Sequence, residues 1–399
     1  MWFAMLGSLS AEERAGLRVA AAVCVVIFFA DASHSVVIPI FPAFAEGLGA
    51  NLAMIGLYGS AVGVAMVLLS VPIGGLSDRL GRKGVMLMGF ALFTLVPIVY
   101  ILSSTPIHLL TARLLLGVAQ GSTFGIGFIW IHEVTQGRAR SMAHGLYMTS
   151  MGIGFTTGPI LGGFATSAWG YTAAFAISSL LGAIGLVCLL LVRGGTELPM
   201  RDQNRASMRE ALADPRVLAA GVSNFINSLL YSTLITFYPL YGALIGLASS
   251  EIGLGLTVRG LLSTVIRFPS GAVSRGRVIL PLIFTSLGGS AVILILMSWS
   301  TGLGAVLLLM GAQGLVYGVY LTAGNIYVTQ EAHPEHRGAA MGVYSSFANV
   351  SNVVCPLAVG GIGQLYGLSA AFQVAGSVSF LGVVTAMLLL RRAASRSPG

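Results

Sequence analysis

Residues 74–84 read GGLSDRLGRKG, a short polar turn between two apolar runs at 53–75 and 84–103. The turn holds one acidic and three basic side chains, whereas the flanking runs are almost free of charge. Each run is about as long as the 20 residues that a helix needs to cross a bilayer. The turn therefore links two membrane-spanning helices, and the same alternation continues along the rest of the chain.

The composition also indicates a membrane protein. Of 399 residues, 56% are hydrophobic and 9% are charged, and the mean hydropathy is +0.89. Soluble proteins carry roughly a quarter charged residues. We therefore expect an all-α membrane protein with twelve transmembrane helices, at 17–41, 53–75, 84–103, 107–133, 142–165, 171–192, 217–241, 251–273, 278–299, 302–329, 340–362 and 369–390.

The basic residues predict how the chain is oriented. All but three of the 21 Lys and Arg residues lie near the termini or in loops that follow even-numbered spans; the exceptions are Arg113, Arg259 and Arg267. By the positive-inside rule, both termini face the cytoplasm of a multi-pass protein in the cell membrane. The net charge of +8 then requires no nucleic-acid partner. Ser10 and Glu13 predict a capping box that starts the first helix, which we expect to be retained rather than cleaved.

The two halves of the sequence repeat each other. Phe41-Pro42 matches Tyr238-Pro239, and the AAF run ending at Phe175 matches the AAF run ending at Phe372, at one common offset. Parallel repeats of this kind are a transporter architecture with the substrate site between them. We expect two pseudo-symmetric six-helix bundles, residues 1–192 and 217–399, joined by a cytoplasmic linker at 193–216.

The turn at 74–84 resembles the loop signature of the major facilitator superfamily, G-x-L-x-D-R-x-G-R-[RK]. The matching residues are Gly74, Leu76, Asp78, Arg79, Gly81, Arg82 and Lys83. The resemblance implies a loop that latches the two halves at the cytoplasmic side. In physical terms, Asp78 can meet a helix N-terminus such as that of span eleven, and Arg82 can pair with Glu133.

Span five contains GIGFTTGPILGG, in which glycines surround a proline. It resembles the antiporter signature G-x8-G-x3-G-P-x2-G-G, matched by Gly145, Gly154, Gly158, Pro159, Gly162 and Gly163. This resemblance to the drug:proton antiporter branch implies export of a small molecule in exchange for protons by alternating access. Gly154 and Gly158 are four residues apart and give one bare helix face, which we expect to pack against span eight.

Ionisable side chains are rare within the spans, and such groups usually face a cavity. Asp31 lies about 15 Å and Arg113 about 9 Å from the expected outer ends of their helices. We expect the two to be close and Asp31 to carry the coupling proton; a permanent structural ion pair is the alternative. His34 is on a similar face of span one and either shares the proton or acts as a neutral hydrogen-bonding side chain.

Arg259 lies about 12 Å inside span eight. With Asp31 assigned to Arg113, it would give the cavity surplus positive charge and suit an anionic or zwitterionic substrate; the alternative is a side chain that snorkels to water. Further polar groups that would line the cavity, or would form packing hydrogen bonds between helices instead, are Gln120, Asn224, Asn227, Tyr231, Asn325, Asn349 and Asn352.

The sequence contains no catalytic cluster and no metal-ligand spacing, and Cys24, Cys188 and Cys355 are isolated. We expect a transporter rather than an enzyme or receptor, a monomer without metal or cofactor that is powered by the proton gradient. Its partners would be a small-molecule substrate, drug-like or charged, together with protons and membrane lipids. An importer or facilitator of the same fold, and a lipid or glycolipid flippase, remain as alternatives.

Overall fold

The computed structural model describes residues 10–192, 214–331 and 337–396, and within these ranges the regular structure is entirely helical. Most of the expected linker at 193–216 lies outside the described residues. The first half contains α2 (Ala11–Val37), α3 (Phe41–Gly47), α4 (Leu52–Leu102), α5 (Pro106–Gln120), η1 (Gly121–Gly125), α6 (Ile126–Val134), α7 (Gly137–Trp169) and α8 (Tyr171–Leu191). The second half contains α10 (Pro215–Leu244), α11 (Ser249–Val273), η2 (Gly276–Val278), α12 (Ile279–Met297), α13 (Leu303–Glu331), α14 (Arg337–Tyr366) and α15 (Leu368–Arg396).

The prediction of twelve spans is confirmed within the described ranges. The helix α4 supplies two of them, because Gly81 has a φ of +78° and breaks the helix where the polar turn lies. The segments α5, η1 and α6 form one span that includes a π-helical turn, which the sequence did not predict. The predicted capping box is present at the start of α2, where Glu13 N donates to Ser10 Oγ at 3.1 Å and Ser10 N donates to Glu13 Oε2 at 2.9 Å.

The end of span one differs from the prediction. The first helix stops at Val37 rather than at residue 41, and the chain turns into the short helix α3. Two prolines explain the change. Pro39 has no N–H group to continue α2, and Pro42 is favoured in the first turn of a new helix, where that group is not needed.

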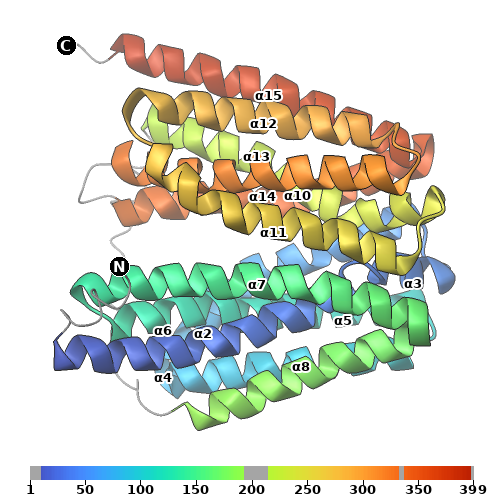
Figure 1. The fold of residues 1–399 in the computed structure, drawn as a ribbon, viewed down its shortest axis with the longest axis horizontal. Coiled ribbons are helices and arrows are strands. Elements are labelled where there is room, and N and C mark those ends of the chain that lie inside the picture. Colours follow the sequence, from blue (N-terminus) through green and yellow to red (C-terminus); the bar gives the residue numbers. More distant parts are fainter. Residues whose placement is uncertain (1–9, 193–213, 332–336, 397–399) are drawn as a thin grey trace.

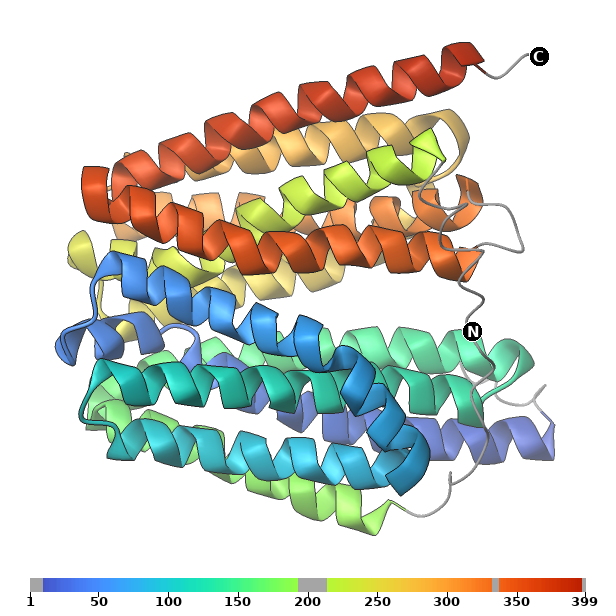
Figure 2. The ribbon, with the colours of Figure 1, turned by 180° about the vertical axis from the view of Figure 1, so that it is seen from behind.

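Each half forms its own bundle, and the two bundles lie side by side (Figure 1). Helices α7 and α11 meet across one side of the junction, and α4 and α14 meet across the other (Figure 2). Length and hydropathy mark nine of the described helices as able to cross a membrane, with α4 counted once; α7 and α11 are not among them. Small and polar residues of these two helices, among them Gly163, Gly253 and Thr257, lie at the junction, where helix packing rather than lipid contact decides composition.

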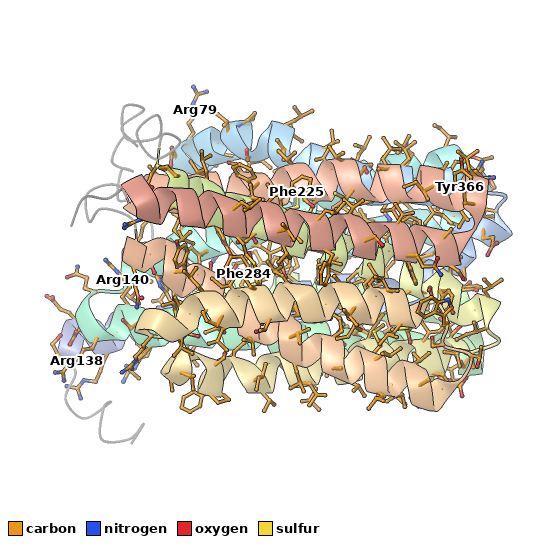
Figure 3. The ribbon with its side chains drawn as sticks, turned by 90° about the horizontal axis from the view of Figure 1, so that it is seen from above. Arg79, Arg138, Arg140, Phe225, Phe284 and Tyr366 are labelled. Carbon is orange, nitrogen blue, oxygen red and sulfur yellow. The ribbon has the colours of Figure 1, made fainter. Side chains whose placement is uncertain are left out.

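The two ends of the molecule differ in charge. Arg79, Arg138 and Arg140 lie at one end, here called the basic end, and Tyr366 lies at the opposite end (Figure 3). Helix α2 begins and α15 finishes at the basic end (Figure 1), as an even number of spans requires.

The halves are joined at the opposite end. Ser250 N donates to Ser167 Oγ at 3.0 Å, Leu52 N to Gln364 Oε1 at 3.1 Å, and Leu357 N to Ser60 Oγ at 3.1 Å. The deepest contact is midway along α7, where Thr257 Oγ1 donates to the carbonyl of Thr156 at 3.0 Å. Among the described residues, no hydrogen bond or ion pair joins the halves nearer the basic end. The molecule is therefore closed at the opposite end.

Candidate functional site

A cavity of about 220 Å³ lies between the halves, on the basic-end side of the Thr156–Thr257 contact. We call it the central cavity. It receives Asp31 from α2 and otherwise side chains from α7, α10, α11 and α13. Its lining residues are Asp31, Met148, Met151, Gly152, Phe155, Tyr231, Arg259, Gly260, Ser263, Thr264, Arg267, Tyr317 and Leu321.

Arg259 is held rigidly in the wall of this cavity, with 1% of its surface exposed. Its Nε donates to Gln313 Oε1 on α13. The rings of Tyr231 and Tyr317 are stacked, with centroids 5.1 Å apart, and the guanidinium carbon lies 5.0 Å and 4.5 Å from them. Its Nη2 has no hydrogen-bond partner among the described residues. Arg259 therefore does not snorkel to water but presents a charged donor inside the molecule.

Asp31 shares the cavity with a second guanidinium, that of Arg267, whose positive charge acts on the carboxyl group. Arg267 Nη2 donates to Ser263 Oγ at 3.4 Å, and its Nε has no partner within the described residues. No ion pair within 4.0 Å joins Asp31 to any described base. One carboxyl group thus faces two guanidinium groups, so the cavity carries surplus positive charge even when Asp31 is ionised.

The expected pairing of Asp31 with Arg113 is wrong. The guanidinium carbon of Arg113 lies 3.4 Å above the ring of Phe41, beside His34, in a separate cavity nearer the opposite end. The reason is the helix packing: α2 lies against α7 and α8, whereas α5, which carries Arg113, lies against α4. Span four meets α2 chiefly through α6. The surplus charge predicted for the central cavity is present, but the guanidinium that accompanies Arg259 there is that of Arg267 rather than that of Arg113.

The prediction that the bare face of Gly154 and Gly158 packs against span eight is also wrong. Side chains on Gly154 and Gly158 would collide with Asp31, Ala32 and Ser35 of α2, in the same half. Gly162 likewise meets Val36 of α2. These glycines, spaced as on one helix face, bring α7 against α2 and so place Asp31 at the cavity wall.

Other glycines make the contact between the halves. Gly163 lies against the backbone of Ser249 and Ser250 on α11, and Gly253 lies against Pro159 of α7. Gly152 faces Thr264. The contact between spans five and eight that we predicted does form, but through this second set of small residues.

The polar turn at 74–84 is a network within the first half. Arg82 Nη2 and Nε donate to the two carboxylate oxygens of Glu133 at 2.7 and 3.1 Å, as the sequence predicted, and Nη1 donates to Asp78 Oδ1 at 2.6 Å. The hydrogen bond with Glu133 is the main cause that raises the pKa of Arg82 above its usual value. Lys83 Nζ donates to the carbonyls of Leu190 and Val192 at the end of α8. The turn thus joins the ends of α6 and α8 to α4.

The predicted contact of Asp78 with span eleven is absent in this conformation. Asp78 bonds to Arg82 of its own turn, and no hydrogen bond or ion pair joins it to the described part of the second half. A side chain built on Gly74 would find no atom within 4 Å. The turn does not latch the halves while the molecule is closed at the other end.

A comparison with known families decides the class of protein. The family model described as Major Facilitator Superfamily matches residues 23–244 and 220–399. The chain belongs to the Major Facilitator Superfamily. It is accordingly a multi-pass membrane transporter.

Individual relatives in this superfamily are distant. An uncharacterised MFS-type transporter of Methanocaldococcus jannaschii is 20% identical, over 86% of this chain and 93% of its own length. The quinolone resistance protein NorA of Staphylococcus aureus is 22% identical, over 91% and 94%. A crystal structure of the nucleoside transporter NupG superimposes with a TM-score of 0.78 at 14% identity, covering 93% and 99%. That likeness shows a shared fold.

Of the polar side chains predicted for the cavity, Tyr231 lines it. Asn224 Nδ2 donates to the carbonyl of Tyr344 at 2.9 Å and so packs α10 against α14, which was the alternative. Asn325 is exposed and bonds a carbonyl of its own helix. The remaining predicted residues, none of which lines the central cavity, are Gln120 and Asn227, both buried, Asn352, partly buried, and Asn349, exposed.

The sequence analysis missed Gln313, Tyr317 and the cavity role of Arg267. Gln313 had a usable signal, because the AQG run at 312–314 repeats the run that contains Gln120. Tyr317 follows Gln313 by one helical turn and so shares its face. Arg267 lies near the predicted end of span eight, where a basic residue is readily attributed to the membrane orientation of the chain. Nothing in the sequence shows that its side chain points into the cavity.

Proposed function

We propose that this transporter exports a small organic anion or zwitterion in exchange for protons, with Asp31 as the proton-carrying group. The observation that carries the proposal is the composition of the central cavity, in which one buried acid and two guanidinium groups face one space between the halves. The acid can hold or release a proton, and the guanidinium groups can hold an anion.

Asp31 suits coupling because it has no ionic partner among the described residues. A carboxyl group in a permanent ion pair would remain ionised, whereas Asp31 is buried without an ion pair to any described residue. Arg267, which shares the cavity with it, stands on the other half of the molecule. When the halves rock, the distance between the two changes, and with it the affinity of Asp31 for a proton.

The unpaired donors favour an anionic group on the substrate. Arg259 Nη2 and Arg267 Nε have no partner among the described residues, and a planar guanidinium suits carboxylates and phosphates. Met148, Met151 and Phe155 give the cavity an apolar side that suits a hydrocarbon or aromatic body. At about 220 Å³ the cavity is smaller than the roughly 300–1,000 Å³ of drug-sized pockets, which favours compact substrates.

Charge and likeness both support export as the direction of transport. By the positive-inside rule, we expect the basic end to face the cytoplasm when the protein spans the cell membrane. The central cavity would then lie toward the cytoplasm. The antiporter glycines of α7 and the distant relative named for quinolone resistance both favour export. A molecule captured from the cytoplasm would leave after the α7–α11 contact opens.

The test is transport in proteoliposomes with an imposed pH gradient. Uptake into inside-out-oriented vesicles with an acidic lumen is measured for matched cationic, neutral and anionic aromatic compounds. The proposal expects accumulation of the anionic or zwitterionic member and its collapse by a protonophore. Accumulation of the cation alone would refute the substrate class, and accumulation that ignores the pH gradient would refute proton exchange.

A second candidate, transport of an anionic lipid, is favoured by the outer surface of α11. Phe268 and Val265, next to Arg267, are 89% and 60% exposed and would face the acyl chains of the bilayer. An amphiphile could keep its chains there and its headgroup at Arg267. Reconstitution with a fluorescent anionic lipid distinguishes the candidates, because only this one predicts movement of lipid between leaflets.

A further inference from the structure

A second, smaller cavity of about 70 Å³ lies nearer the opposite end. We call it the outer cavity. Arg113 and His34 come from the first half, and Ile235 and Thr236 of α10 come from the second. It is separate from the central cavity and shares none of its lining residues.

Arg113 has no counter-ion within the described residues. No carboxylate lines the outer cavity, and the groups that act on Arg113 electrostatically are the hydroxyls of Tyr58 and Tyr100. Its guanidinium rests on the ring of Phe41 at 3.4 Å, a contact that offsets part of the cost of burying it. A guanidinium stays charged at any physiological pH. The outer cavity therefore holds an uncompensated positive charge.

The polar side chains around this space can all donate hydrogen bonds. Arg113 Nε and His34 Nδ1 are buried and have no hydrogen-bond partner in the described part of the chain. Thr236 adds a hydroxyl group from the other half, and Ile55 and Ile235 make the remaining wall apolar. Donors around a fixed cation, with no carboxylate nearby, select an anion.

The size of the space restricts which anion fits. A single water needs about 10–15 Å³ measured in the same way, so the outer cavity accommodates a few waters or one small ion but no organic substrate. We propose that the outer cavity is a binding site for a small monovalent inorganic anion of the size of chloride, distinct from the site of the transported molecule.

The position of this site gives the anion a conformational effect. Arg113 and Thr236 belong to different halves, and they face the same space while the molecule is closed at the opposite end. Opening that end would separate them. A bound anion therefore stabilises the conformation described here over the alternative one.

The test is the melting temperature of the full-length protein in detergent as chloride replaces gluconate at constant ionic strength. The wild type should show a saturable rise. Arg113→Gln should raise the half-saturating chloride concentration at least tenfold, and Thr236→Val, which keeps the shape of the side chain, should raise it several-fold. Arg267→Gln, the matched loss of a guanidinium from the central cavity, should leave it unchanged.

Three results would overturn the proposal. They are the absence of a saturable rise in the wild type, an equal rise in Arg113→Gln and wild type, and loss of the rise in Arg267→Gln alone, which would place the anion in the central cavity. If Arg113→Gln does not fold, Thr236→Val decides, since an unchanged half-saturating concentration there contradicts the outer site.

Discussion

Asp31 and Arg259 face the same cavity from different halves of the molecule, one on α2 and the other on α11. Arg259 is fixed by Gln313 and by two stacked tyrosines, so its charge does not adapt to what enters the cavity. Asp31 is packed against the bare surface of Gly154 but has no ionic partner in the described part of the chain. At the scale of single residues, Arg259 can hold an anionic substrate without changing its own charge. Asp31, in contrast, can bind or release a proton when that substrate enters.

Arg259→Lys tests the planar geometry at constant charge. A lysine cannot stack on the rings of Tyr231 and Tyr317 as a guanidinium does, nor offer paired donors to a carboxylate. We expect the apparent affinity for the anionic substrate to fall about tenfold, which corresponds to about 1.4 kcal/mol. The measurement is the concentration dependence of transport. Asn325→Ala, outside the central cavity, is the control, and equal losses in both variants would argue against a specific role for Arg259.

Glu133→Gln tests the network around Arg82. Arg82 has only 7% of its side chain exposed, so neutralising its main partner leaves a largely buried charge with Asp78 as its remaining ionic partner among the described residues and Ser77 as a neutral one. We expect a loss of roughly 1–3 kcal/mol of stability, seen as a lower melting temperature in detergent. Arg138→Gln, at the same end, is the control. A melting temperature unchanged by Glu133→Gln would show that the network adds nothing to stability.

At the scale of helices, much of the fold could be predicted because membrane crossing imposes a length and a hydropathy that the sequence displays. The turn at Gly81 and the Arg82–Glu133 pair were likewise readable, since both lie in one short motif and its neighbour. Side-chain direction was not readable. Arg113 and Arg267 are both basic residues within predicted spans, yet Arg267 shares a cavity with Asp31 and Arg113 does not, because the rotation and the neighbours of each helix decide where a side chain lies.

The two sets of glycines on α7 have different tasks, and matched variants separate them. A side chain on Gly158 would meet the backbone of Ala32 at 2.8 Å within its own half, so Gly158→Val should lower the melting temperature. A side chain on Gly163 would meet Ser250 Cα at 3.1 Å in the other half. Gly163→Val should therefore spare the fold of each half but hinder closure at the opposite end.

The measurement for this pair combines thermal melting with the labelling of a cysteine introduced at Ser167. Gly163→Val should increase labelling from the opposite end, with a melting temperature closer to wild type than that of Gly158→Val. If Gly158→Val instead increased labelling without loss of stability, the assignment of the two glycine sets would be reversed.

At the scale of the whole molecule, the hydrogen bonds that join the two bundles within the described residues lie midway along the helices and toward the opposite end. The contact between Ser167 and Ser250 is one of the hydrogen bonds that join them there, at 3.0 Å. Alternating access requires this contact to break once in each cycle, after which the polar turn would be free to approach the second half.

A disulfide across this contact should therefore stop transport. Ser167→Cys with Ser250→Cys, in a background where Cys24, Cys188 and Cys355 are replaced, should lose nearly all transport on oxidation and recover it on reduction. The single-cysteine variants are the controls. Full transport by a completely cross-linked protein would mean that the halves do not separate at this point.

The most direct test of the central claim is proton-driven transport by Asp31→Asn in proteoliposomes. The variant cannot carry a proton but keeps the size of the side chain and the surrounding guanidinium groups. We predict that accumulation driven by a pH gradient falls at least tenfold, while exchange of labelled for unlabelled substrate without a gradient persists. Undiminished gradient-driven accumulation by Asp31→Asn would contradict the claim that Asp31 couples protons to transport.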